Sequence, residues 1–298
     1  MQKYRQYVLP AAIVLGLLLH NVCASLSFLV PKLIFLILFL TFSAVDLRKI
    51  RFNWLDLWLI VYQIVASAVL YLGITLLGGS KIIAEGAMMA ALCPVAASST
   101  VIACMLGASR QTMTGYSIFG NLMVAIVAPL FFVLIGDHPE QSLGTAYLLM
   151  LGKIGSTLAL PFFAVLALQV VWPKANAWVS RYTGWSFYVW AIALLLTLGQ
   201  TIHFIFKQGQ GHWAVIAWLG GISLLACIFQ FWLGHRLGRR FGDVVSGGQL
   251  MGQKNSAMGI WMCVTFLNPL SSVLMAFYSV FQNLYNAWQI ARYKMNRV

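Results

Sequence analysis

Charged residues are scarce in this chain. Asp, Glu, Lys and Arg make up 8% of its 298 residues, only six of them are acidic, and 61% of the residues are hydrophobic. The mean hydropathy is +0.86. A soluble domain usually carries about 25% charged residues to cover its surface. The composition therefore excludes a soluble domain and predicts an integral membrane protein.

Cysteine is also sparse. The five cysteines all lie in or beside apolar segments, and no two form a C-x-x-C pair. Such spacings are the sequence signal of metal sites and disulfide frameworks. We therefore expect the thiols to pack in the interior, without a metal or a disulfide.

Long apolar runs are what the chain has instead. A helix needs about 20 apolar residues to cross a membrane, whereas a barrel strand needs about 10 with alternating polarity. The run Leu33–Leu40 is apolar on every side, which favours an all-α helical bundle. We predict ten membrane-spanning helices, or nine if one is re-entrant, at residues 7–24, 28–46, 54–77, 82–106, 113–136, 148–171, 185–206, 213–235, 243–266 and 269–291.

The basic residues predict the orientation. The formal net charge of +13 falls in alternate loops, which is typical of the positive-inside rule and not of a nucleic-acid-binding face. Cytoplasmic N- and C-termini place most of the 19 basic residues on the cytoplasmic side. Short loops without a transit-like extension favour a bacterial inner membrane. Residues 1–24 resemble a signal peptide, but we interpret them as a retained first span, because their removal would leave an odd number of spans.

Small and polar residues interrupt two of the predicted spans. The fourth span contains Cys93–Thr100, with Pro94 at its start, and the ninth contains Gly252–Gly259. The two spans are five apart, so a repeat of that unit would be inverted in the membrane and its broken helices would meet near the midplane. The alternative is that Pro94 merely kinks a packed helix and that the small residues are helix contacts. The pairing of the two interruptions favours the first interpretation.

Lys254 lies inside the second interruption. An ammonium at mid-membrane costs several kcal/mol unless it meets a polar cavity or a partner, so the residue is a candidate functional site. The alternative is a snorkelling lysine whose ammonium reaches the headgroups, as we expect for Lys153. The polar neighbours of Lys254 favour a functional role.

Three motifs together resemble the bile acid:sodium symporter family. They are Cys93-Pro94 followed by a small/Ser/Thr run, Gly252-x-x-Asn255-Ser256, and Pro269-Leu270 leading to the aromatic-rich stretch 277–283. The resemblance covers nearly the whole chain. It implies two inverted five-helix repeats, residues 1–140 and 141–298, with helices 4 and 9 broken and crossing. It also implies a panel domain of spans one, two, six and seven, and a core domain of the other spans.

The resemblance also implies the site residues. Those expected to line the crossover and bind substrate are Pro94, Ala97, Ser98, Thr100, Lys254, Asn255 and Ser256. Those expected at the ion-site positions are Gln63, Ser99, Thr100, Ser117, Asn121, Leu250, Gln253 and Lys254. Leu250 stands where the family has a sodium-binding glutamate, and Lys254 stands where it has a sodium-binding glutamine.

These two replacements make sodium coupling doubtful, because a desolvated Na⁺ needs oxygen ligands and every acidic residue is predicted at a span end or in a loop. The ammonium of Lys254 could occupy the place of one sodium ion, could release its proton during the cycle, or could pair with a substrate carboxylate.

Family resemblance implies a secondary transporter of a small organic anion that works by alternating access. We expect transport to be sodium-independent or proton-linked. The candidate coupling ions are Na⁺ and H⁺, and no cofactor is expected. One alternative is a conventional sodium symporter with ligands displaced to Gln249, Gln253 and backbone carbonyls. Another is a membrane receptor or sensor that binds an anion without moving it. An enzyme is disfavoured, since no nucleophile–base set or acid pair is visible. The expected partners are the anion and the bilayer, with a monomer or weak homodimer as the assembly.

Overall fold

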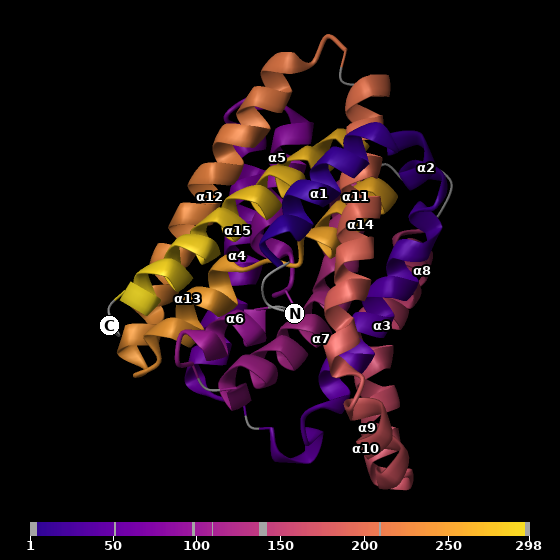
Figure 1. Cartoon of the computed structure of the whole chain (residues 1–298). Helices are drawn as coiled ribbons and strands as arrows, with labels where there is room; N and C mark the ends of the chain where they lie inside the picture. The colour runs from indigo at the N-terminus through magenta and orange to yellow at the C-terminus, as the bar shows by residue number, and fades with distance from the viewer. Residues whose placement is uncertain are drawn as a thin grey trace.

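The chain folds into helices. A computed structural model describes residues 5–50, 52–96, 99–108, 110–136, 142–208 and 210–295, and within these ranges it contains no strand longer than one isolated bridge. The helices are α1 (Arg5–Leu18), α2 (His20–Ser25), α3 (Val30–Ser43), α4 (Trp54–Leu76), α5 (Lys81–Leu92), α6 (Ser99–Met105), α7 (Arg110–Ile135), α8 (Leu143–Leu158), α9 (Leu160–Val171), α10 (Pro173–Ser180), α11 (Ser186–Gln208), α12 (Trp213–Arg240), α13 (Val244–Gly252), α14 (Ser256–Phe266) and α15 (Ser272–Met295) (Figure 1).

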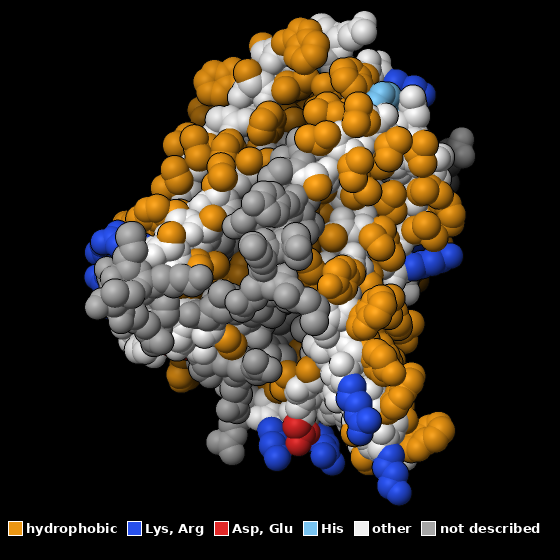
Figure 2. Space-filling view, viewed as in Figure 1, with side chains coloured by type: hydrophobic (Ala, Val, Ile, Leu, Met, Phe, Trp, Pro, Cys, Tyr) orange, Lys and Arg blue, Asp and Glu red, His pale blue; other side chains and the backbone are white. Residues whose placement is uncertain are grey.

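Four described helices are long and apolar enough to cross a membrane by themselves, namely α4, α7, α11 and α12. A fifth candidate is the pair α8 and α9, which bends by 49°. Large apolar side chains are exposed along the bundle, and Figure 2 shows them covering most of the described surface, with Lys and Arg gathered at its edges. Water would not solvate such a surface, so the all-α fold is that of an integral membrane protein.

Two predicted spans contain breaks that the sequence pattern did not predict. The segment predicted as a helix over 7–24 is divided into α1 and α2 at Leu19. The segment predicted over 148–171 begins earlier, at Leu143, and bends just before Pro161. Proline has no backbone N–H and its ring crowds the preceding turn, so a helix bends or restarts at this position.

The two interruptions expected from the small and polar residues are present. The first separates α5 from α6, and the second separates α13 from α14. The second is shorter than predicted, because Gly252 still belongs to α13 and α14 already begins at Ser256. The side chain of Asn255 accepts a hydrogen bond from the N–H of Met258, and this cap restarts the helix.

The N-terminal and C-terminal halves of the chain interlock. α12 packs against α13, α15 and α5, while α11 packs against α1, α2 and α3. Figure 1 shows α12, α15 and α5 on one side of the molecule, and α3, α8, α9 and α10 on the other. The two broken helices lie where elements of both halves meet.

Glycines let α12 and α13 approach very closely. A Cβ atom on Gly234 would lie 2.4 Å from the carbonyl oxygen of Gly247, and one on Gly252 would lie 2.3 Å from the ring of Phe231. Small residues at a crossing allow two backbones to touch, which is a common way to join helices in membranes. This packing fixes α13 on α12 and so holds the second interruption in place.

Candidate functional site

The two interruptions meet through their main chains. Val95 and Lys254 form an antiparallel bridge, in which the N–H of Ala96 donates to the carbonyl of Gln253 at 3.0 Å and the N–H of Asn255 donates to that of Pro94 at 2.8 Å. Exchanging residues 94–96 with residues 253–255 converts each of these bonds into the other. Unwound backbone inside a membrane protein needs such partners, because lipid offers none.

The main chain of Lys254 is held on its other side by one carboxamide. Its N–H donates to Oε1 of Gln282 at 2.8 Å, and its carbonyl accepts from Nε2 of the same side chain at 3.0 Å. Gln282 belongs to α15 and is 4% exposed. This pair of bonds satisfies both polar groups of the residue at the centre of the break.

The ammonium of Lys254 is buried and points at the end of the other broken helix. The side chain is 1% exposed, and Nζ donates to the carbonyl of Ala91 at 3.0 Å. Ala91 lies in the last turn of α5, where the carbonyls lack helical partners and the helix dipole is negative. A cation contributed by the second half of the chain therefore caps a half-helix of the first.

Two glutamines complete this cap. Nε2 of Gln63 in α4 donates to the carbonyl of Cys93 at 3.0 Å, and Nε2 of Gln230 in α12 donates to that of Ala90 at 3.1 Å. Both side chains are 1% exposed. The carbonyl oxygens at the end of α5 thus form a small buried acceptor site, occupied by two amides and one ammonium.

Each glutamine is oriented by a buried tyrosine. The hydroxyl of Tyr116 in α7 donates to Oε1 of Gln63, while the hydroxyl of Tyr278 in α15 accepts from Nε2 of Gln230 at 3.2 Å. Tyr278 also donates to the carbonyl of Gly252, the last residue of α13, at 2.8 Å. The two halves of the chain therefore place matching Gln–Tyr pairs beside the crossover.

Apolar side chains surround Leu250. This residue is 0% exposed and belongs to a buried cluster drawn from α4, α6, α7, α13 and the first interruption. Its members are Leu55, Leu59, Val95, Ala103, Met113, Tyr116, Leu250 and Met251. The side chains of this described cluster, apart from the hydroxyl of Tyr116, offer no oxygen ligand to a metal cation.

The remaining predicted residues are distributed around the crossover. Ser99 and Thr100 begin α6, and Ser117 and Asn121 lie in α7, where Nδ2 of Asn121 donates to the carbonyl of Ser117. Oγ of Ser99 and Oδ1 of Asn121 are buried and accept no hydrogen bond from the described part of the chain. Ala97 and Ser98 lie outside the described residues. Asn255 and Ser256 lie at the start of α14.

The prediction omitted Tyr116, Gln230, Tyr278 and Gln282 as site residues. A signal for three of them exists in the sequence, because Tyr-Ser-Ile-Phe-Gly-Asn at 116–121 recurs as Tyr-Ser-Val-Phe-Gln-Asn at 278–283. Each copy lies in the helix that follows a broken pair, α7 or α15. In both copies the amide of the asparagine donates to the carbonyl of the serine. A search for internal repeats would have found this motif.

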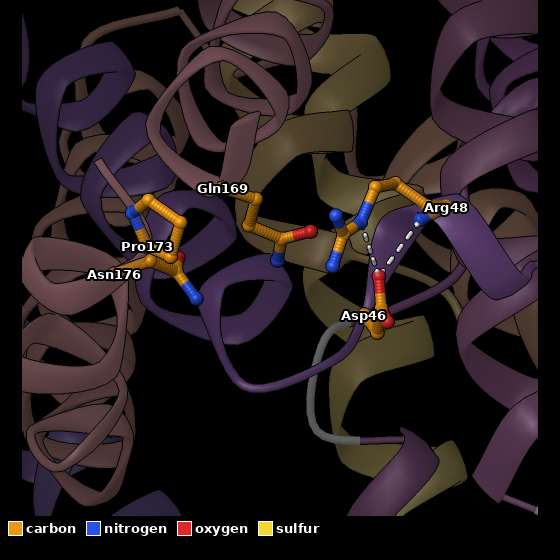
Figure 3. Close-up of a pocket in the computed structure, with 5 residues that line it drawn as sticks. All are labelled: Asp46, Arg48, Gln169, Pro173 and Asn176. Atoms are coloured by element: carbon orange, nitrogen blue, oxygen red, sulfur yellow. Dashed lines mark hydrogen bonds and ion pairs between the residues drawn. The ribbon is translucent and has the colours of Figure 1, made fainter. Parts of the chain in front are cut away.

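A separate hollow of about 200 Å³ lies away from the crossover, between the turn after α3 and the ends of α9 and α10. Figure 3 shows Asp46 bonded to Arg48 on one side of it, with Gln169 and Asn176 facing them. Gln169 accepts from the N–H of Leu47 and donates to the carbonyl of Val45, so its polar atoms are used in fixing the turn. The Arg48 guanidinium beside Asp46 holds the pKa of that carboxyl below its usual range. The polar side chains of this hollow therefore serve to hold the turn after α3 in place.

No protein-family model matches the chain, and no curated protein matches it.

Proposed function

We propose that this chain is a secondary transporter that moves a small organic anion, of carboxylate or sulfate type, by alternating access. The observation that carries the proposal is the crossover, where two interrupted helices are bridged by main-chain bonds and a buried ammonium caps one of them. Half-helix ends facing each other at membrane depth are the binding architecture of many transporters.

We further infer ten crossings arranged as two inverted repeats. The described helices group into ten segments when α1 with α2, α5 with α6, α8 with α9, and α13 with α14 each count as one and the short helix α10, of 8 residues, is left out. The exchange symmetry of the bridge supports a two-fold axis in the membrane plane, and so does the recurrence of the motif at 116–121 and 278–283. The resemblance to the bile acid:sodium symporter family points to the same layout.

Coupling in this proposal is sodium-independent or proton-linked, with the ammonium of Lys254 in place of one sodium ion. Nζ donates to a helix-terminal carbonyl, as a cation at that position should. Leu250, which packs in a hydrophobic cluster, stands where the resembled family has the carboxylate on which its sodium site depends. The substrate anion would then be attracted by the remaining hydrogen-bonding capacity of the ammonium.

The test compares the purified wild type with Lys254→Gln and with the double variant Leu250→Glu/Lys254→Gln. Thermal stability is measured in sodium and in potassium across pH, and uptake of radiolabelled pantoate and of a sulfated steroid is measured in proteoliposomes. We expect wild-type stability to be indifferent to sodium and the folded double variant to gain sodium-stimulated uptake. A double variant that folds and stays indifferent to sodium contradicts the assignment of the ion position.

A conventional sodium symporter is the alternative within transport. Gln249, one of its displaced ligands, is 0% exposed and donates to Asn286 and Gln289, while its Oε1 receives no hydrogen bond from a described residue. Sodium-specific thermal stabilisation of the wild type, lost in Gln249→Leu, would favour this alternative. Anion binding without any uptake or exchange in liposomes would favour a receptor.

A further inference from the structure

Three arginines that pair with no carboxylate in the described part of the chain gather at the end of α12. Arg236, Arg239 and Arg240 are exposed and line a hollow of about 290 Å³. None of the three forms an ion pair with a described carboxylate, whereas Arg48 and Lys49 pair with Asp46 on another part of the surface. The nearest acidic residue in the sequence, Asp243, accepts a hydrogen bond from the N–H of Ser246 and caps α13. Within the residues that the structure describes, the three guanidinium groups thus have no carboxylate partner and are available to an external anion.

The spacing of the three arginines along the helix brings their like charges close together. Residues three and four apart on a helix are neighbours, and like charges at these positions destabilise the helix. The negative end of the helix dipole favours cations in this last turn, but that effect is about 0.3–1 kcal/mol per charge and is screened by salt. A bound anion would convert this repulsion into attraction, and guanidinium groups suit phosphate because they donate paired hydrogen bonds.

An apolar stripe leads to these arginines along the same helix face. Leu225, Ile228, Phe229 and Trp232 are 48–67% exposed, and helical geometry places them in line with Arg236. The opposite face of α12 is buried against the bundle through Ser223, Cys227 and Gln230. The arginines at the helix end suit a lipid headgroup, and the apolar stripe next to them suits acyl chains. The two surfaces therefore follow one another in the order found in a phospholipid.

Tryptophans mark the depth of the arginine hollow in the membrane. The guanidinium of Arg236 lies 5.7 Å from the ring centre of Trp232, and that of Arg292 in α15 lies 5.4 Å from that of Trp288. Trp side chains prefer the membrane–water interface, where lipid phosphates lie. Figure 2 shows basic side chains at this edge of the molecule, next to apolar ones.

We propose that Arg236, Arg239 and Arg240 form a binding site for the phosphodiester headgroup of an anionic membrane phospholipid, whose acyl chains lie along the stripe from Trp232 to Leu225. Basic hollows beside membrane helices on the cytoplasmic side suit such lipids. The site would anchor α12, and with it α13, at the membrane surface. It does not depend on transport, so it can be tested without a substrate.

The experiment is native mass spectrometry of the full chain in detergent, titrated with phosphatidylglycerol or with phosphatidylcholine. We expect one phosphatidylglycerol to be retained at least tenfold more strongly than phosphatidylcholine. The triple variant Arg236→Gln/Arg239→Gln/Arg240→Gln should lose this preference. The matched control, Lys49→Gln/Lys174→Gln/Arg181→Gln, removes the same charge from other exposed positions and should keep it.

A third triple variant, with lysine at positions 236, 239 and 240, keeps the charge and guards against failure of the glutamine variant to fold. It should show an intermediate preference, because lysine cannot donate the paired bonds of arginine. Equal retention of the two lipids by the wild type overturns the proposal, as does equal loss of preference in the control variant. Displacement of the lipid by millimolar inorganic phosphate would identify a free-anion site and overturn it as well.

Discussion

The two interrupted helices solve the same physical problem in different ways. At the end of α5, the buried carbonyls receive three side chains, namely Gln63 and Gln230 from two other helices and Lys254 from the second break. At the end of α13, Tyr278 caps the last carbonyl, and Gln282 holds the main chain of the break itself. The charge therefore comes from one break and acts on the other, so the candidate site exists only when both halves of the chain are assembled.

The two broken helices also differ in how they pack against their neighbours. The α13 helix lies against α12 through glycines whose backbones touch, whereas at Gly86 in α5 the nearest neighbour is a leucine methyl group. One broken helix is held by close backbone contact through its glycines, and the other by side-chain packing along its length together with hydrogen bonds at its end. Four sets of substitutions test this comparison, in order from the largest expected effect to the smallest.

The largest effect should follow Gln282→Leu. This change leaves the N–H of Lys254 without its buried partner, while the carbonyl loses one bond and keeps the one from the N–H of Ser256. An unsatisfied buried group costs about 1–3 kcal/mol and a lost hydrogen bond about 0.5–1.5 kcal/mol, so we expect a loss of about 2–4 kcal/mol, measured as a shift of the unfolding midpoint in detergent. The control is Asn283→Leu on the same helix, where the amide only bonds the carbonyl of Ser279 within its own helix. An equal shift in both variants would show that Gln282 is not special.

Gly234→Ala should come next. The new Cβ would lie 2.4 Å from a backbone oxygen of α13, which cannot move aside, and overpacking of this kind typically costs about 1–3 kcal/mol. Gly86→Ala should cost less, because its nearest neighbour, 3.0 Å away, is the end of the Leu219 side chain. Gly152→Ala meets nothing within 4 Å and should be neutral or stabilising, by up to about 1 kcal/mol. The reverse order of thermal midpoints would contradict the packing comparison.

The two tyrosines offer a matched pair of smaller changes. Tyr278→Phe removes the donor to the carbonyl of Gly252 and the acceptor for Gln230, whereas Tyr116→Phe removes only the donor to Gln63. We expect about 1–3 kcal/mol for the first and about 0.5–1.5 kcal/mol for the second. Chemical denaturation of the two variants side by side measures the difference. Equal values would mean that the cap on α13 contributes little.

The smallest effect belongs to Asp46, which lies far from both breaks in an exposed turn. Its carboxyl has a pKa held below the usual range by Arg48, so the stability it adds is present above the unfolded-state pKa and is lost as the pH falls through the folded-state value. Asp46→Asn should therefore lower the thermal midpoint slightly at pH 7 and not at all in strong acid, with a smaller difference at high salt. A large shift at neutral pH would show that this turn supports the bundle.

The sequence predicted the existence of both breaks but not their contacts. Pro94 and the polar run after Gly252 disrupt the helix ladder wherever they are placed, so their effect is local and readable. Asn255 caps α14, so the helix begins again at Ser256 and the break is shorter than predicted. The partner of Lys254 could not be foreseen, because the acceptor is the carbonyl of an alanine, and residue type says nothing about such a group.

Composition and periodicity alone thus determined that the chain is helical and inserted in a membrane, because apolar runs of membrane length are not stable when exposed to water. They also identified Lys254, since a lone ammonium in such a run needs a partner. Only the tertiary structure decided what that partner is, by bringing residues 91 and 254 together from opposite halves of the chain. Contacts between distant segments depend on how all the helices pack at once, and no local pattern in the sequence encodes that arrangement.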